Sequence, residues 1–201
     1  MTNVTKSPNG YYYKKINGVN TRVPAPVKEL VQGSLKEIFR YVRQALIIDG
    51  SPDQEACGIL EKGSGMYTCL MTNKGTTNKN GRPMCLQPKA DYLWHTHPRN
   101  SKIFPSKEDV VMLLRRVVKK SVIFTLHGFW VMDKNVEKHV IIDKGDYYHK
   151  LMMRLEKENG KLYYAPVTNR GKEYNESVFR QYSEGVHRAM DGKVTIKFYA
   201  F

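Results

Sequence analysis

Two histidines and an aspartate are spaced so that three metal ligands could meet. His95 and His97 are separated by one residue, and Asp109 follows farther along the chain. If the histidines lie on a strand, their side chains point to the same side while Thr96 points to the other. Two imidazole nitrogens and one carboxylate are typical of catalytic zinc, because three protein ligands leave a fourth position for water. The spacing therefore predicts a metal site that activates water.

A zinc ion in such a site lowers the pKa of bound water to about 7 and so supplies hydroxide at neutral pH. We therefore expect a hydrolase that binds one Zn²⁺ per chain through His95, His97 and Asp109. A His-x-His pair by itself is weak evidence, since paired histidines on a strand are more often core or surface residues. The interpretation depends on the wider arrangement of residues around the pair.

The flanking sequence indicates which elements would position these side chains. The apolar run 92–94 predicts a strand that leads directly into His95, and Pro98 ends it. After a polar loop, Ser106 and Asp109 form the Ser-x-x-Asp pattern of a helix start, followed by apolar residues at helical spacing. A strand end and the first turn of a helix would thus bring the three ligands together.

The order of these residues resembles that of a known family. His95-Thr-His-Pro, seven residues and then Ser106-x-x-Asp109 match the signature of the JAB/MPN family of JAMM zinc metalloproteases. The family also has an upstream glutamate in the pattern Glu-x-Cys-Gly-x-Leu, which this chain matches at Glu55-Ala-Cys-Gly-Ile-Leu. The resemblance covers about residues 28–142.

The resemblance implies a role for each matched residue. The two histidines and Asp109 bind the metal, Glu55 is the general base and acid, and Ser106 steadies the oxyanion. A carboxylate in the place of Glu55 can take a proton from water during attack on an amide and return it to the leaving amine. Asp53 and Glu61 are its nearby rivals, and both fit the motif less well.

Each of these residues also has a purely structural interpretation. Glu55 could be a solvated residue near the start of a strand. Ser106 could be a helix N-cap worth about 1 kcal/mol, and this role can coexist with a catalytic one. Asp109 could be an acidic residue favoured by the helix dipole, although the dipole does not explain its spacing from two histidines.

By the same resemblance, the fold class is α/β, with an MPN/JAB-like (cytidine-deaminase-like) mixed sheet flanked by helices. We expect an N-terminal arm at residues 1–24, which contains extended chain or a short strand. A JAB/MPN-like catalytic domain is expected at 25–145, and a C-terminal helical extension packed on the same core at 146–201.

Hydrophobic periodicity predicts the individual elements. A helix is expected from Val27 to Leu46, because apolar residues recur there at intervals of three and four. Residues 73–91 carry turn residues and little periodicity, which predicts a long irregular loop. Further strands are expected at 56–60, 66–72, 122–126, 129–132, 140–142 and 194–199, and helices at 148–158 and 177–190.

The composition is that of a soluble globular protein with a basic surface. The formal net charge of +14 favours an acidic protein or nucleic-acid partner, although the basic run at 99–120 could equally be a solvated helix face. No apolar stretch suits a membrane span or a secretory signal, so we expect a cytoplasmic protein with no membrane partner. Cys57, Cys69 and Cys85 lack CxxC spacing and are expected to be reduced thiols.

Smaller expectations concern residues around the site. Trp94 should support the metal-bearing strand from the core, and Cys57 should pack beneath the metal site. His127 lies between two apolar runs and is expected to be a core histidine. Surface positions are expected for His139, His149 and His187.

The resemblance implies a protein or peptide substrate, cleaved at a peptide or isopeptide bond at the C-terminus of ubiquitin or a ubiquitin-like protein. The loop 73–91 would help to hold the extended tail of that modifier. Relatives that process sulfur carriers, or cell-wall or phage-tail peptides, leave other substrates open, and a DNA-repair-associated branch has no settled activity. A nucleic-acid- or protein-binding scaffold is the alternative from another class; the charge favours it, and the intact ligand set argues against it.

Overall fold

The computed structural model describes the chain in ten segments, and all structural statements below concern these. They are residues 4–6, 12–16, 19–23, 28–77, 83–85, 90–99, 103–115, 118–136, 146–163 and 176–201.

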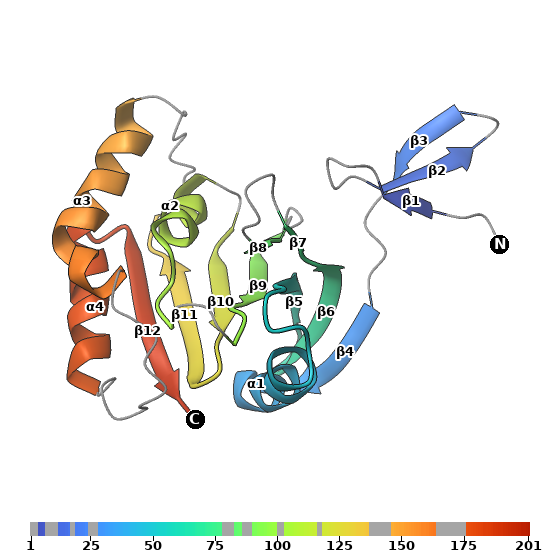
Figure 1. Cartoon of the computed structure of the whole chain (residues 1–201), viewed down its shortest axis with the longest axis horizontal. Coiled ribbons are helices and arrows are strands. Elements are labelled where there is room, and N and C mark those ends of the chain that lie inside the picture. The colour runs from blue at the N-terminus through green and yellow to red at the C-terminus, as the bar shows by residue number, and fades with distance from the viewer. Residues whose placement is uncertain are drawn as a thin grey trace.

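The main element of the fold is a seven-stranded sheet (Figure 1). Its strands are β4 (Lys28–Gly33), β5 (Ala56–Lys62), β6 (Tyr67–Lys74), β9 (Tyr92–Thr96), β10 (Lys120–Phe124), β11 (Gly128–Lys134) and β12 (Val194–Ala200). They lie in the order β12-β11-β10-β9-β5-β6-β4. β9 and β10 pair in parallel, and the other neighbours are antiparallel. The expected mixed sheet of an α/β protein is therefore confirmed.

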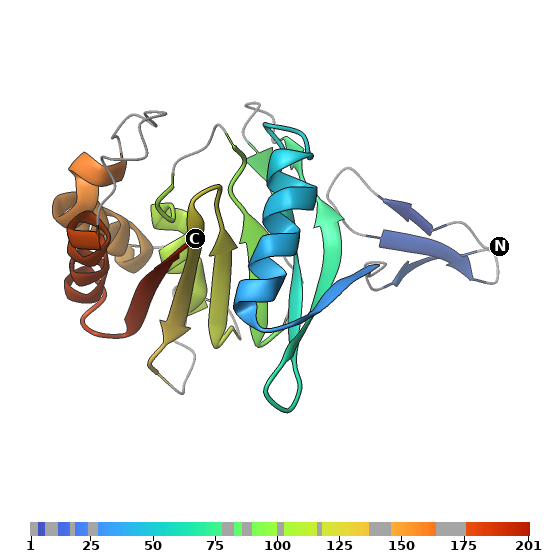
Figure 2. The same ribbon diagram turned by 90° about the horizontal axis from the view of Figure 1, so that it is seen from below.

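Helices cover both faces of this sheet. On one face lie α1 (Leu35–Val42) and the π-helical segment η1 (Arg43–Ile48) that continues it; Figure 2 shows α1 along that face. On the other face lie α2 (Lys107–Arg115), α3 (Asp146–Tyr163) and α4 (Glu176–Ala189). Each face has its own hydrophobic core, as a sheet covered on both sides requires.

The alternation of side chains along β9 decides which way the site faces. Trp94 packs in the core beneath α1, whereas Leu93 packs in the core beneath α2. Because successive side chains point to opposite faces of a sheet, His95 shares the face of Leu93 and Thr96 shares the face of Trp94. The first histidine of the His-x-His pair is thereby directed toward α2.

The helix expected from Val27 to Leu46 is wrong in its first part. Residues 28–33 form the edge strand β4, which pairs with β6, and the helix begins only after Ser34. The Ser34 side chain accepts a hydrogen bond from the Glu37 N–H, and the Glu37 carboxylate accepts one from the Ser34 N–H. This reciprocal capping box fixes the start of α1 and separates it from the strand.

Most of the other expected elements are confirmed. The strands predicted at 56–60, 66–72, 122–126, 129–132 and 194–199, and the two C-terminal helices, are β5, β6, β10, β11, β12, α3 and α4. The loop predicted at 73–91 contains two short paired strands, β7 (Thr76–Thr77) and β8 (Pro83–Met84). The strand expected at 140–142 lies outside the described residues.

Strands near the N-terminus form a separate small sheet. β1 (Val4–Lys6), β2 (Tyr12–Ile16) and β3 (Val19–Val23) pair antiparallel in the order β1-β2-β3. This sheet lies to one side of the seven-stranded sheet (Figure 1). The expected extended arm or short strand is thus a three-stranded sheet.

No helix in the described part of the chain is long and apolar enough to cross a membrane.

Candidate metal centre

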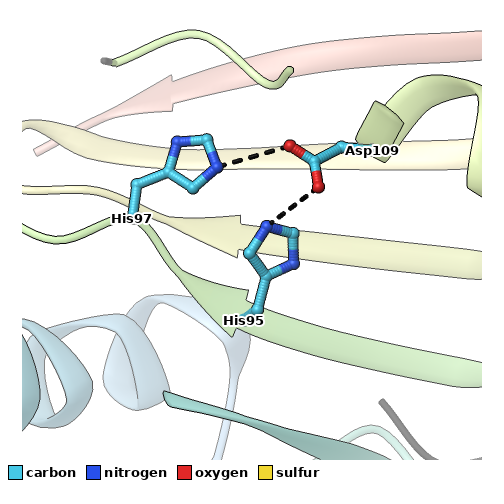
Figure 3. A group of neighbouring side chains, drawn as sticks. All are labelled: His95, His97 and Asp109. Atoms are coloured by element: carbon cyan, nitrogen blue, oxygen red, sulfur yellow. Dashed lines mark ion pairs between the residues drawn. The ribbon is translucent and has the colours of Figure 1, made fainter. Parts of the chain in front are cut away.

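The two histidines and the aspartate converge as their spacing predicts. The ligand atoms of His95, His97 and Asp109 all lie within 4.8 Å of one another. His95 Nε2 is 3.3 Å from Asp109 Oδ1, and His97 Nε2 is 3.4 Å from Asp109 Oδ2. Figure 3 shows the Asp109 carboxylate pointing toward both imidazole rings. The three side chains form a group close enough to bind one metal ion.

The separations from each imidazole nitrogen to the Asp109 carboxylate are of the size found between ligands of one metal ion. Zinc–nitrogen and zinc–oxygen bonds of about 2.0–2.2 Å place adjacent tetrahedral ligands about 3.3–3.5 Å apart. Each imidazole nitrogen lies at such a separation from an oxygen of Asp109. His95 and His97 are only 4% and 6% exposed, so most of the donor set is already shielded from water. Two imidazoles and a carboxylate are ligand types that zinc accepts, so the residues present could hold such an ion.

The pairing of β9 with both neighbouring strands fixes the positions of the two histidines. His95 lies opposite Ile123 in the parallel pair with β10 and opposite Cys57 in the antiparallel pair with β5. His97 follows the end of β9, and its N–H donates to the Phe124 carbonyl at 2.8 Å. The backbone on either side of Thr96 is thereby held in extended form, which keeps the two imidazoles on one side.

Ser106 and Asp109 form the predicted helix start. The N–H and the hydroxyl of Ser106 both donate to Asp109 Oδ2 at 2.7 Å. The Asp109 N–H in turn lies 3.1 Å from Ser106 Oγ. This capping arrangement places Asp109 in the first turn of α2 and orients its carboxylate toward the histidines. The structural interpretation of Ser106 as a cap is confirmed, and its catalytic role stays a prediction.

The histidines keep the Asp109 carboxyl ionised. Burial by itself would raise the pKa of Asp109, but the charges of His95 and His97 and their hydrogen bonds hold that pKa well below its usual value. An ionised carboxylate is the form that binds a cation.

Glu55 lies beside the group, just before β5. Burial raises the pKa of its carboxyl, and Asp109 adds to this rise, while His95 and His97 oppose it. The carboxyl therefore interacts electrostatically with all three candidate ligands. A raised pKa suits a group that must both take and return a proton. The rivals Asp53 and Glu61 are both exposed.

Hydrogen bonds between β5, β6 and β9 hold the strand that follows Glu55. The Ala56 N–H donates to Thr96 Oγ1 at 2.8 Å, on the face opposite the histidines. Trp94 is fully buried, and its indole N–H donates to the Leu70 carbonyl at 3.1 Å. This indole passes close to Gly58, where a side chain would collide with it. Trp94 supports the strand from the core, as expected.

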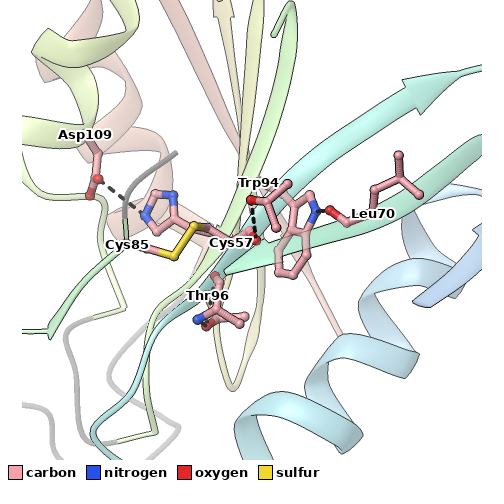
Figure 4. Close-up of a disulfide and its surroundings, with 9 residues drawn as sticks. Cys57, Leu70, Cys85, Trp94, Thr96 and Asp109 are labelled. Atoms are coloured by element: carbon pink, nitrogen blue, oxygen red, sulfur yellow. Dashed lines mark hydrogen bonds and ion pairs between the residues drawn. A yellow bond between two sulfur atoms is a disulfide. The ribbon is translucent and has the colours of Figure 1, made fainter. Parts of the chain in front are cut away.

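The expectation of three reduced cysteines is wrong. Cys57 on β5 and Cys85 just after β8 form a disulfide, which Figure 4 draws with Trp94, Thr96 and Asp109 around it. Cys69 is a free thiol in the core, where burial raises its pKa to about 12. The disulfide joins the residue that follows β8 to the strand beside the metal centre. An odd number of cysteines without paired spacing gave no signal for it.

Among the described residues, no other histidine joins the group of His95, His97 and Asp109. His127 is exposed in the turn between β10 and β11, so the expectation of a core histidine is wrong. It is displaced from the core because Thr125 hydrogen-bonds Gly128 and turns the chain outward there. His149 and His187 are exposed, as expected, and His139 lies outside the described residues.

Comparison of the chain with protein-family models, with curated proteins and with solved structures finds no match.

Proposed function

We propose that the chain is a zinc-dependent peptidase of the JAB/MPN (JAMM) type that hydrolyses peptide or isopeptide bonds. The observation that carries this proposal is the convergence of His95, His97 and Asp109 within 4.8 Å, mostly buried, at the end of a strand and the start of a helix. The order and spacing of these residues, with Glu55 upstream and Ser106 before the helix, support the same assignment.

Each residue of the site has a chemical task in this proposal. When bound, zinc supplies Lewis acidity and makes water nucleophilic near neutral pH. Glu55 takes a proton from the attacking water and gives it to the leaving amine, for which its raised pKa is suited. The Ser106 hydroxyl, which donates to Asp109 at rest, turns to donate to the oxygen that gains negative charge.

The substrate we propose is the C-terminal tail of ubiquitin or a ubiquitin-like protein. An extended tail can add to exposed strand edges, and β7 and β8 form a small paired segment near the site. The Cys57–Cys85 disulfide ties the end of that segment to β5. Because Cys57 lies opposite His95, this bond supports a role for β7 and β8 in guiding a peptide toward the metal centre.

The metal is tested by elemental analysis of the purified protein, with His95→Ala and Asp109→Ala as comparisons. We expect one zinc per chain, which is lost in both variants. Exposed Asp53 provides the matched control, because Asp53→Ala removes a nearby carboxylate and leaves the candidate ligands intact. Protein without stoichiometric metal, or variants that keep it, would contradict the assignment.

The peptidase activity is tested with a panel of isopeptide-linked conjugates, linear fusions of ubiquitin-like proteins and cross-linked cell-wall peptides. We expect cleavage of at least one modifier conjugate by zinc-loaded protein and a loss of at least 100-fold in Glu55→Gln, since proton transfer contributes about 10²–10⁴-fold. Cleavage of the cell-wall peptides alone would show that the substrate is a cell-wall peptide and not a ubiquitin-like protein. If wild type and variant both left all conjugates intact, the proposed activity would be contradicted.

A binding scaffold that only recognises nucleic acid is less well supported. The net charge of +14 favours it. However, Lys107, Lys119 and Lys120 of the basic run are each paired with a carboxylate, of Glu156, Asp91 and Asp133 respectively. These carboxylates thus interrupt the positive charge on this part of the surface. Affinity for DNA or RNA that falls steeply with salt, in protein without metal, would favour the scaffold.

A further inference from the structure

The C-terminal helices contact the segment that precedes Ser106. The Tyr182 side chain of α4 is fully buried, and its hydroxyl donates to the Pro105 carbonyl at 2.8 Å. The Tyr182 ring also lies against Phe104, with centroids 4.8 Å apart. Residue 182 therefore reaches the site from a part of the chain that the JAMM-like signature does not include.

This hydrogen bond acts on a peptide unit that also touches the metal centre. The Pro105–Ser106 unit carries the carbonyl bound by Tyr182 and the N–H that donates to Asp109 Oδ2 at 2.7 Å. A peptide unit is planar and stiff, so the direction of its carbonyl determines the direction of its N–H. The tyrosine hydroxyl therefore constrains the orientation of a donor that fixes the Asp109 carboxylate.

Two further contacts hold the same segment. The Trp130 indole N–H donates to the Ile103 carbonyl at 2.8 Å. On the other side of Ser106, Lys107 forms an ion pair with Glu156 of α3. The chain is thus fixed before and after the residue that caps α2.

We propose that Tyr182 is a positioning residue that orients Asp109, and with it Ser106, through the Pro105–Ser106 peptide unit. This inference rests on the proposed function in so far as Asp109 is a metal ligand. It gives the C-terminal helices a second task besides completing the core, because they set the geometry of a ligand that lies in a different part of the chain.

The matched variants are Tyr182→Phe and Tyr147→Phe. Both remove one tyrosine hydroxyl from the C-terminal helices, but the Tyr147 hydroxyl is exposed and accepts from Lys193 instead. Trp130→Phe is a second test variant, because it removes the indole hydrogen bond to the Ile103 carbonyl and keeps an aromatic ring. Circular dichroism and thermal unfolding identify the variants that keep the fold.

The first measurement uses metal-free protein and the backbone amide of Ser106 observed by NMR. We expect its proton to move upfield and to exchange faster in Tyr182→Phe, because the N–H is no longer aimed at Asp109. Trp130→Phe should change it in the same direction, and Tyr147→Phe should not change it. An unaltered Ser106 amide in both test variants overturns the proposal, whether or not the protein binds metal.

The second measurement is a titration with Co²⁺, whose visible absorption reports ligand geometry. Residues that orient metal ligands typically contribute 10–100-fold to metal affinity. We expect Tyr182→Phe to bind Co²⁺ at least 10-fold more weakly with an altered spectrum, while Tyr147→Phe matches wild type. Equal affinity and spectrum in all three proteins overturn the proposal. A wild type that binds no Co²⁺ contradicts the proposed function, and the amide measurement then decides the role of Tyr182.

Discussion

Cys57 lies directly opposite His95 across the antiparallel pair of β5 and β9. Side chains of directly opposed residues share one face of a sheet, so the Cys57 sulfur is on the face of the metal centre. Its bond to Cys85 therefore joins the wall of the site to a segment 28 residues farther along the chain. The disulfide affects both the stability of the fold and the surroundings of the site.

Loss of this disulfide should destabilise the protein measurably. Closing a loop of 28 residues removes unfolded-state entropy worth about 3–4 kcal/mol at 25 °C. We expect Cys85→Ser to lower the free energy of unfolding by about this amount in urea denaturation without reductant. With a dithiol reductant, wild type and variant should become equal. A wild type that is insensitive to the reductant would show that the thiols are not paired.

Metal binding should stabilise the folded state. A ligand that binds only native protein at 100 times its Kd contributes about 2.7 kcal/mol. For a chain of 201 residues we expect Zn²⁺ to raise the Tm by roughly 5–10 °C, and a chelator to reverse the rise. His97→Ala should show no such shift in thermal unfolding. A shift of equal size in this variant would place the bound metal elsewhere.

Gly58 should not tolerate even a methyl group. A Cβ at this position would collide with the Leu70 carbonyl and the Trp94 indole nitrogen. Overpacking of this kind costs about 1–3 kcal/mol, so Gly58→Ala should lower the free energy of unfolding and weaken metal binding by displacing β5. Gly63→Ala is the control, since its Cβ would meet only the Met66 carbonyl at an ordinary 3.6 Å. Equal stability of the two variants would contradict the close approach of the Leu70 carbonyl and the Trp94 indole to Gly58.

The capping box of α1 should contribute a pH-dependent stability. Hydrogen bonds from the backbone and side chain of Ser34 lower the pKa of Glu37. A carboxyl whose pKa is lowered by folding stabilises the protein above its unfolded-state pKa, and loses this effect as the pH falls through the folded-state pKa. We expect Glu37→Gln to be less stable than wild type at pH 7, with the difference vanishing in acid. A difference that does not change with pH in urea denaturation would contradict this origin.

The sequence predicted the candidate metal centre well because the patterns that position its residues lie close together in the sequence. Strand alternation placed His95 and His97 on one side, and the Ser-x-x-Asp pattern placed Asp109 in the first turn of α2. Their convergence within one group is confirmed. Their identity as zinc ligands, and the roles of Glu55 and Ser106, stay predictions.

Long-range pairing explains what the sequence did not predict. Lys28–Gly33 has apolar residues whose spacing fits a helix, but the partner strand β6 draws it into the sheet. The Cys57–Cys85 bond depends on where Cys85, just after β8, lies relative to β5, which the local pattern does not encode. The contact of Tyr182 with Pro105 likewise joins residues 77 apart in the chain.

The 77-residue separation of Tyr182 and Pro105 in the sequence also affects the order in which the site forms during synthesis. A growing chain leaves the ribosome from its N-terminus, so β9 and the start of α2 emerge well before α4. Until α4 has emerged and packed, the Pro105 carbonyl lacks the tyrosine hydroxyl that holds it. Contacts between distant residues form late in folding. If Tyr182 orients Asp109 as proposed, we expect a nascent chain to carry this aspartate for some time before it acquires its final orientation.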